Sequence, residues 1–131
     1  MCSPGAWDTR TMNATEALQR LADTIDAHDW DGIAELLHPE FVCQLVATNE
    51  RFDARSWIAF NAGYPGFQSM KIVDLVGDSE RAAARGVVTG LVNGVQKGFA
   101  VAQFARMREG LIDELVEVWA DLDDVAPPGT R

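Results

Sequence analysis

Apolar residues in the first part of the chain recur with the spacing of a helix. Between residues 14 and 27 they repeat every three or four positions, which predicts an amphipathic helix with one buried face. Asn13 stands directly before this segment and Glu16 follows three residues later, which is the pattern of a helix N-cap. The apolar face consists of Leu18, Leu21, Ala22 and Ile25.

Two further helices and one strand are predicted before the middle of the chain. A short helix over about 31–37 ends before Pro39, because a residue that precedes proline is disfavoured in helical geometry. Residues 41–46, FVCQLV, are apolar except for Gln44, which predicts a buried strand. Asp53 then caps a third helix over 54–64, which ends at the sequence YPG.

The pattern changes to strand-forming runs from Met70 onward. Four runs are separated by the turn-forming stretches GDSE, NGVQKG and REG, which predicts an antiparallel meander. The runs are MKIVDLVG, RAAARGVVTGLVN, GFAVAQFARMR and LIDELVEVWAD. Three helices, one strand among them and then four long strands define an α+β fold, with the helices on one face of a curved sheet. A curved sheet closed by helices leaves a conical hollow, which suits a small molecule.

The last run, residues 111–121, has a second interpretation. Its leucines and Val118 also fit the spacing of a helix. The strand is favoured because Gly110 makes a tight turn directly before it, and because Val116, Val118 and Trp119 prefer strands.

The composition is that of one ordinary globular domain. The chain has 131 residues and a net charge of −9, which argues against a nucleic-acid partner, because phosphate binding needs clustered Lys and Arg. No segment resembles a signal peptide or approaches the ~20 apolar residues of a membrane span, so we expect a cytoplasmic location and no membrane contact. Cys2 and Cys43 are not expected to form a disulfide, and neither His28 nor His38 stands near other metal ligands. The sequence therefore predicts no metal and no cofactor.

The chain is expected to hold one folded domain between two flexible ends. Residues 1–13 lack periodicity and predict a leader, within which Met12 is a candidate for the natural start. The domain is expected over residues 14–122, followed by a frayed tail over residues 123–131.

Three segments resemble the nuclear transport factor two-like superfamily, in particular its SnoaL-like polyketide cyclase branch. DAHDWDGIAELLHPEFV (26–42) resembles the helix–loop–strand opening of that fold, AAARGVVTG (82–90) its third long strand, and FARMREGLIDELVEVWAD (104–121) its closing hairpin. The resemblance covers about residues 14–121 and implies a cone-shaped antiparallel sheet wrapped on about three N-terminal helices, the cystatin-like topology. The superfamily includes ketosteroid-isomerase-like and limonene-epoxide-hydrolase-like enzymes, cyclases, dehydratases and non-enzymatic binding domains, so the resemblance does not select one function.

The resemblance also implies catalytic positions. In limonene-epoxide-hydrolase-like members an Arg acts with two Asp residues, which correspond here to Arg85, Glu117 and Val87. The His that SnoaL-like cyclases carry beside the closing-strand acid is missing. The base of ketosteroid-isomerase-like members falls on Gln44 or Leu45, neither of which takes up a proton at neutral pH. Each known catalytic set is therefore incomplete, and Glu117 and Arg85 are the catalytic candidates that remain.

Glu117 is the main candidate, because it interrupts an apolar and aromatic strand face. In an extended strand its side chain shares a face with those of Leu115 and Trp119. One interpretation is a cavity-lining general acid or base, since burial raises the pKa of a carboxyl group. The alternatives are a side chain in solvent, or a structural ion pair with Arg85 across the sheet.

Five residues are candidates for substrate binding: Gln44, Trp57, Tyr64, Gln103 and Trp119. Gln103 interrupts an apolar run, so it either contacts a ligand or is a satisfied core amide, and Gln44 has the same two interpretations. Trp57, Phe60 and Tyr64 form a stripe on the third helix, which is either core packing or an apolar wall of the hollow.

Two functions are compatible with these residues. The first is a pocket for a small, apolar, ring-containing molecule, with cofactor-free isomerisation, cyclisation or dehydration by proton transfer if the protein is an enzyme. Glu117 would then be the general acid and base, and Arg85 would hold its charge or an oxyanion. The second is a non-catalytic ligand-binding or dimerisation module, in which a small apolar face packs against a second copy in a homodimer. That face consists of Ala82, Ala84, Gly86, Val88, Gly90 and Val92.

Overall fold

The computed structural model describes residues 12–123 and 125–130. In chain order the elements are the helices and strands α1 (Ala14–Asp26), α2 (Trp30–Ile33), a short 3₁₀ helix η1 (Ala34–Leu36), β1 (Leu37–Leu45), β2 (Glu50–Asp53), α3 (Ala54–Ala62), β3 (Phe67–Gly77), β4 (Arg81–Val92), β5 (Val95–Arg108) and β6 (Leu111–Asp121). The predicted leader falls on residues 1–13, of which residues 1–11 lie outside the described part of the chain. Met12 is buried and belongs to the core.

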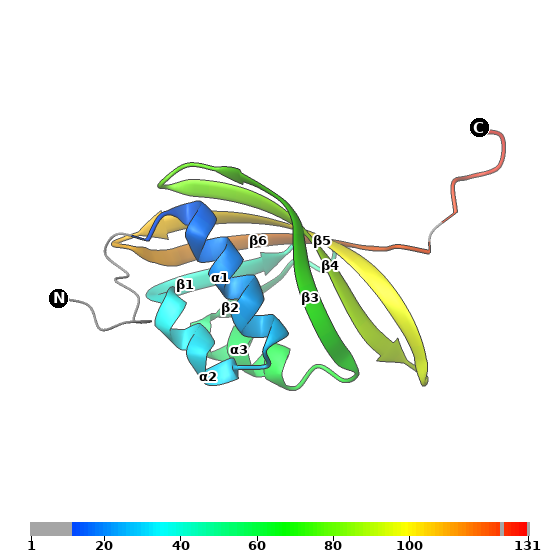
Figure 1. The fold of residues 1–131 in the computed structure, drawn as a ribbon, viewed down its shortest axis with the longest axis horizontal. Helices are drawn as coiled ribbons and strands as arrows, with labels where there is room; N and C mark the ends of the chain where they lie inside the picture. The colour runs from blue at the N-terminus through cyan, green and yellow to red at the C-terminus, as the bar shows by residue number, and fades with distance from the viewer. Residues whose placement is uncertain (1–11, 124, 131) are drawn as a thin grey trace.

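The strands form one sheet in the order β2-β1-β6-β5-β4-β3. Every neighbouring pair is antiparallel except β1 and β6, which run parallel. The long strands curve around α1, and α2 and α3 lie on the same side of the sheet (Figure 1). The predicted α+β class, with helices segregated to one face of a curved and mostly antiparallel sheet, is confirmed.

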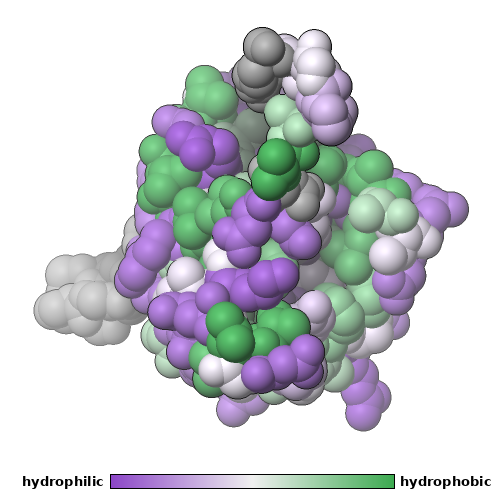
Figure 2. Space-filling model, turned by 90° about the vertical axis from the view of Figure 1, so that its right-hand side faces the viewer, coloured by the Kyte–Doolittle hydropathy of each residue, from purple (hydrophilic) through white to green (hydrophobic). Residues whose placement is uncertain are grey.

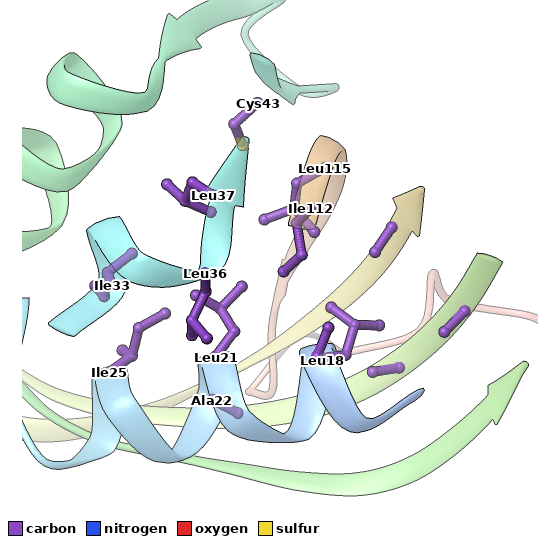
Figure 3. Packing of buried hydrophobic residues seen from close by; sticks show 14 of the residues in the cluster. Leu18, Leu21, Ala22, Ile25, Ile33, Leu36, Leu37, Cys43, Ile112 and Leu115 are labelled. Atoms are coloured by element: carbon purple, nitrogen blue, oxygen red, sulfur yellow. The ribbon is translucent and has the colours of Figure 1, made fainter. Parts of the chain in front are cut away.

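Helix α1 forms as its sequence pattern predicts. The Asn13 side chain accepts a hydrogen bond from the backbone N–H of Glu16 at 2.8 Å, which satisfies one of the free donors of the first turn. The apolar face of α1 points toward the strands, where Leu18 and Leu21 are fully buried (Figure 3). This face closes the concave side of the sheet along most of the helix.

The first part of the sheet differs from the prediction in two ways. Strand β1 begins at Leu37 rather than 41, because Leu37 already pairs with Ile112 of β6. Strand β2 was not predicted, since the polar sequence ERFD at residues 50–53 has none of the alternation of a half-buried strand. It pairs with the end of β1 and forms an edge of the sheet.

The four long strands follow the prediction except that β3 begins at Phe67 rather than Met70, and except at one turn and one bulge. The segment from residue 111 to 121 is a strand, so the helical alternative is wrong. Strand β5 begins at Val95 rather than 98, because Asn93 and Gly94 both adopt positive φ and complete a two-residue hairpin. The β5–β6 register then shifts by one residue between Arg106 and Met107.

The alternation along β4 fixes which face of the sheet is inside. Ala82, Ala84 and Val88 are buried toward the helices, whereas Arg85 is exposed on the opposite, outer face. The face proposed above for dimerisation therefore points inward, and that assignment is wrong because its residues from Ala82 to Gly90 are buried and only Val92, at the end of the strand, is exposed. The outer face of the sheet instead shows Val76, Phe104 and Val118 to solvent.

The ends and surface of the domain complete this description. Val125 is exposed, and residues 125–130 run away from the sheet (Figure 1). At the end of the molecule seen in Figure 2, apolar side chains form several patches separated by polar ones. None of the helices in the described part of the chain is long and apolar enough to cross a membrane.

Candidate functional site

Glu117 lies on the concave face of β6, between Leu45 of β1 and Gln103 of β5. Only 5% of the residue is exposed. Its two neighbours on the same face of the strand are Leu115, which is fully buried, and Trp119. The glutamate that interrupts the apolar strand is therefore an interior residue and not part of a solvated face.

Two side-chain N–H groups bind the buried carboxyl group. Gln103 Nε2 donates to Glu117 Oε2 at 2.8 Å, and Trp119 Nε1 makes a longer contact of 3.4 Å with Glu117 Oε1. Gln103 is itself only 1% exposed, so the pair is shielded from water. Because β5 and β6 are hydrogen-bonded neighbours and the two residues are directly opposite each other, the strand register holds this contact in place.

Burial raises the pKa of the Glu117 carboxyl group above that of a carboxyl in water. The hydrogen bonds from Gln103 and Trp119 oppose this effect, because they stabilise the ionised form. Within the described residues, no Lys, Arg or His forms an ion pair with Glu117. The arrangement favours a carboxyl group that keeps its proton to higher pH than its exposed counterparts do.

Cys43 is the second titratable group beside this carboxyl. It lies on the concave face of β1, is fully buried, and is a free thiol. Burial raises the pKa of the thiol, and the negative charge of Glu117 raises it further. Cys43 therefore remains a protonated, small apolar neighbour of the site.

Two buried polar atoms near the interior have no hydrogen-bond partner within the described chain, Gln103 Oε1 and Trp57 Nε1. A buried polar atom without a partner is rare, because its desolvation is not offset by a hydrogen bond. The unpaired oxygen belongs to the same amide that binds Glu117. The site therefore contains a carboxyl group, an amide N–H that binds it and an amide oxygen that is still free.

One row beyond Glu117 the concave face is accessible at Trp119, whereas Val101 opposite it is buried. Trp119 points to the same side as Glu117 and is 38% exposed. Phe99 on β5 and Ile72 on β3, which lie on the same face by the strand register, are partly buried. Solvent therefore reaches these apolar side chains, while Glu117 lies just inside them.

Two hollows of about 320 Å³ each lie elsewhere on the molecule. One is on the outer face of the sheet, beside Val76, Phe104 and Arg106. The other is next to Met12 and Met107, near the start of α1. Neither of these two hollows is lined by Glu117, which is only 5% exposed.

The predicted pairing of Arg85 with Glu117 is wrong. The Arg85 guanidinium binds Asp74 on β3, with Nε and Nη2 at 2.8 Å and 2.6 Å from the same carboxylate oxygen. Its side chain is 59% exposed on the outer face of the sheet. The reason is the alternation of the strand: Ala84, and not Arg85, faces the interior in the row of Gln103.

The contacts described for the other predicted substrate-binding residues are with residues other than Glu117. Gln44 is on the outer face of β1 and donates to Asn49 Oδ1 at 3.0 Å. Trp57 is buried on α3 with its ring 5.4 Å from that of Phe41, which is core packing. Tyr64 is exposed beyond the end of α3. Of the predicted set, the structure brings together Glu117, Gln103 and Trp119.

A second group of titratable side chains lies at the far end of β5 and β6. Arg106 binds the buried carboxylate of Asp113 with Nε at 3.0 Å and Nη2 at 3.2 Å. Arg108 contacts Asp113 at 3.5 Å and His38 at 3.1 Å. His38 lies in β1 and not at a helix end, and this cluster was not predicted. Its charges compensate one another, which is typical of a structural network.

Among the described residues, no group of three or more His, Cys, Asp or Glu side chains is arranged to hold a metal ion. The expectation that the protein uses no metal and no cofactor stays a prediction.

The fold is that of the nuclear transport factor two-like (NTF2-like) proteins. The SnoaL-like domain family matches residues 18–115, and the chain belongs to this family. The match ends two residues before Glu117, so family membership does not itself assign a role to that residue.

Solved structures with the same fold carry different names. A candidate ketosteroid isomerase from Kribbella flavida DSM 17836 is 24% identical, with a TM-score of 0.72 over 86% of this chain and 84% of that one. An NTF2-like protein of unknown function from Burkholderia xenovorans LB400 is 17% identical, with a TM-score of 0.72 over 87% and 86%. An LEH-like epoxide hydrolase from M. tuberculosis is 15% identical, with a TM-score of 0.69 over 81% of each. No protein with a curated function matches the chain. At these identities the solved structures show that the fold is shared, and they do not show a shared function.

Proposed function

We propose that this protein binds a small, apolar, ring-containing molecule on the concave side of the sheet and uses Glu117 as a general acid and base. The observation that carries the proposal is a carboxyl group only 5% exposed, hydrogen-bonded by Gln103 and Trp119 and without a basic partner in the described residues. The reaction would be a cofactor-free isomerisation, cyclisation or dehydration.

The chemistry follows from the surroundings of the carboxyl group. A carboxyl with a raised pKa is a stronger base when ionised, and it keeps its proton for donation to higher pH. In an isomerisation, the carboxylate would take a proton from a carbon next to a carbonyl, and the electron pair would move into an enolate. The protonated carboxyl would then return the proton at a second carbon, so that no cofactor or water is consumed.

The ligand class follows from the side chains around Glu117. Trp119, Phe99 and Ile72 offer apolar and aromatic surface in the rows nearest to solvent. A flat ring fits such surfaces, since aromatic side chains contribute mainly through their buried area. One oxygen on the ring would reach the carboxyl group. Binding roles for Trp57, Tyr64 and Gln44 stay predictions, and Arg85 has no part in the proposal because it is bound to Asp74.

The test uses 2-naphthol, a rigid ring system with one hydroxyl group, as the probe. Glu117→Gln removes the acid but keeps the shape of the side chain, and Glu114→Gln is the matched control on the outer face of the same strand. We expect quenching of tryptophan fluorescence by 2-naphthol in the wild type and in Glu114→Gln, with binding weakened about tenfold or more in Glu117→Gln. The proposal is wrong if 2-naphthol does not bind, or if all three proteins bind it equally.

Catalysis is tested on the same pair of variants. Once a substrate is found, Glu117→Gln should abolish turnover while the far-ultraviolet circular dichroism stays that of the wild type. Unchanged turnover in Glu117→Gln would remove this residue from the mechanism.

A second candidate function is a non-catalytic ligand-binding or dimerisation module, and the outer face of the sheet favours it. Val76, Phe104 and Val118 are large apolar residues exposed on that face. Such residues next to one another are typical of a protein interface. We propose that two copies pack these faces together in a homodimer.

Sedimentation tests the dimer proposal. The wild type should sediment as a dimer at micromolar concentration, and Phe104→Asp should sediment as a folded monomer, because it places a charge in the proposed interface. Arg51→Glu on the edge strand β2 is the control and should remain dimeric. A monomeric wild type would contradict the proposal.

A further inference from the structure

We propose that Gln103 is a positioning residue whose side-chain amide turns over with the protonation state of Glu117. Its N–H would donate to the ionised carboxylate, and its C=O would accept from the protonated carboxyl group. This inference rests on the proposed function in one respect, namely that Glu117 gains and loses a proton during catalysis.

The geometry provides one half of this exchange directly. Gln103 Nε2 is 2.8 Å from Glu117 Oε2, and the strand register keeps the two residues opposite each other. This orientation suits a carboxylate, which only accepts hydrogen bonds. It leaves Gln103 Oε1 buried and without a partner.

The other half follows from what the protonated carboxyl group needs. Its O–H becomes a buried donor that requires an acceptor. Trp119 cannot provide one, because an indole nitrogen carries a hydrogen and only donates. Gln103 Oε1 has no hydrogen-bond partner and belongs to the amide that already contacts Glu117 Oε2. A rotation of about 180° about the last side-chain torsion of Gln103 would place this oxygen where Nε2 now lies, so that it could accept from the carboxyl O–H.

The two orientations of the amide are close to balanced within the protein. Oxygen and nitrogen of a glutamine amide have nearly the same shape, so the turn changes no packing. In either orientation one end of the Gln103 amide has no hydrogen-bond partner. The cost of this missing hydrogen bond is therefore present in both orientations and does not favour one over the other. The proton on Glu117 therefore decides which end faces the carboxyl group.

Among the described residues, no charged side chain shifts the pKa of the Glu117 carboxyl group. Leu45 and Cys43 face the carboxyl group from β1, Gln103 from β5, and Trp119 lies beside it on β6. Cys43 is the second titratable group, and it stays protonated because burial raises its pKa. No ion pair of the described helices or strands involves Glu117.

Isotope-edited infrared spectroscopy tests the inference without any ligand. The protein is labelled with ¹³C at the glutamine side-chain carbonyl, and difference spectra are recorded as the pH is lowered through the titration of Glu117. We expect one glutamine carbonyl band to shift to lower frequency as Glu117 takes up its proton, because that carbonyl then accepts a hydrogen bond. A fixed Gln103 that only donates would show no such shift.

Two variants assign the band. It should be absent in Gln103→Met, which keeps the shape but has no amide, and it should stop shifting with pH in Glu117→Gln. Gln44→Met, on the outer face of β1, is the control and should keep the shift.

The outcomes separate this inference from the proposed function. A carbonyl band that does not move while Glu117 titrates overturns the inference, even if 2-naphthol binds. A band that moves as described supports it, even if 2-naphthol fails to bind and the proposed ligand class is wrong. Should Gln103→Met not fold, the wild-type and Glu117→Gln spectra still give the answer.

Discussion

Replacing Glu117 with Gln is expected to remove a pH dependence of folding stability that the buried carboxyl group creates. The folded-state pKa of Glu117 is raised by burial, whereas in the unfolded chain the carboxyl is in water. Below the unfolded pKa both states hold the proton and stability does not change. Between the two pKa values the unfolded chain releases the proton and the folded protein keeps it, so stability falls as the pH rises.

The size of the effect follows from one proton. Within that window the free energy of unfolding should fall by about 1.4 kcal/mol per pH unit, and the fall should end above the folded pKa. For a domain of this length, that corresponds to a decrease in Tm of about 3–6 °C per pH unit. Asp26 and Asp78 act in the opposite direction and at lower pH, because hydrogen bonds lower the pKa of each carboxyl group. They are unchanged in the variant and cancel in the difference.

The assay is urea unfolding of the wild type, Glu117→Gln and Glu114→Gln at half-unit steps from pH 4 to pH 9. The stability of the wild type relative to Glu117→Gln should fall through the window, whereas Glu114→Gln should follow the wild type, since Glu114 is half exposed. A constant difference between the wild type and Glu117→Gln over the whole range would refute the reasoning about burial.

Three further predictions concern the fold. Leu18→Ala leaves a cavity at a fully buried position between α1 and the sheet, and it should lower the free energy of unfolding in urea titrations by about 2–5 kcal/mol. Val125→Ala is the exposed control, and an equal loss of stability in this variant would contradict the prediction. Asn13→Ala removes the N-cap of α1 and should cost about 1 kcal/mol in the same assay, with Asn13→Asp restoring most of it; no loss in the alanine variant would refute the capping role. In a Cys2→Ser background the Cys43 thiol should react with a disulfide reagent only when the protein unfolds, because the thiol is buried. Rapid modification of the folded protein would show that Cys43 is accessible to solvent and would contradict its burial.

The sequence predicts the elements well where local pattern and chemistry agree. Helix α1 carries a clear apolar face and an N-cap at Asn13, and both are present in the structure. The meander of β3 to β6 follows from its turn signals. Strand β2 could not be predicted, because Glu50–Asp53 forms through pairing with β1 and not through its own composition.

The candidate site shows a different limit. Alternation correctly puts Glu117, Leu115 and Trp119 on one face, but it does not say which face of β4 lies inside. The predicted pairing of Arg85 with Glu117 was therefore wrong, because Arg85 lies on the outer face of the sheet. The choice between faces depends on where the helices pack, which is a property of the whole fold.

The contact between Gln103 and Glu117 depends on a bulge. From the turn at Glu109 and Gly110, a regular hairpin would set Gln103 opposite Val116. The one-residue shift between Arg106 and Met107 brings Glu117 opposite Gln103 instead. Nothing in the sequence marks that shift, so both residues could be named as candidates while their contact could not.

The most direct test of the account is the titration of the Glu117 carboxyl group itself. Glutamate side chains are labelled with ¹³C at the carboxyl carbon, and the Glu117 resonance is assigned by its loss in Glu117→Gln. If the carboxyl group is buried beneath Trp119 as described, it will titrate at higher pH than a glutamate side chain in water. A Glu117 resonance that titrates at the pH of a glutamate in a short unstructured peptide would mean that water reaches this side chain freely, and the proposed acid–base site would not exist.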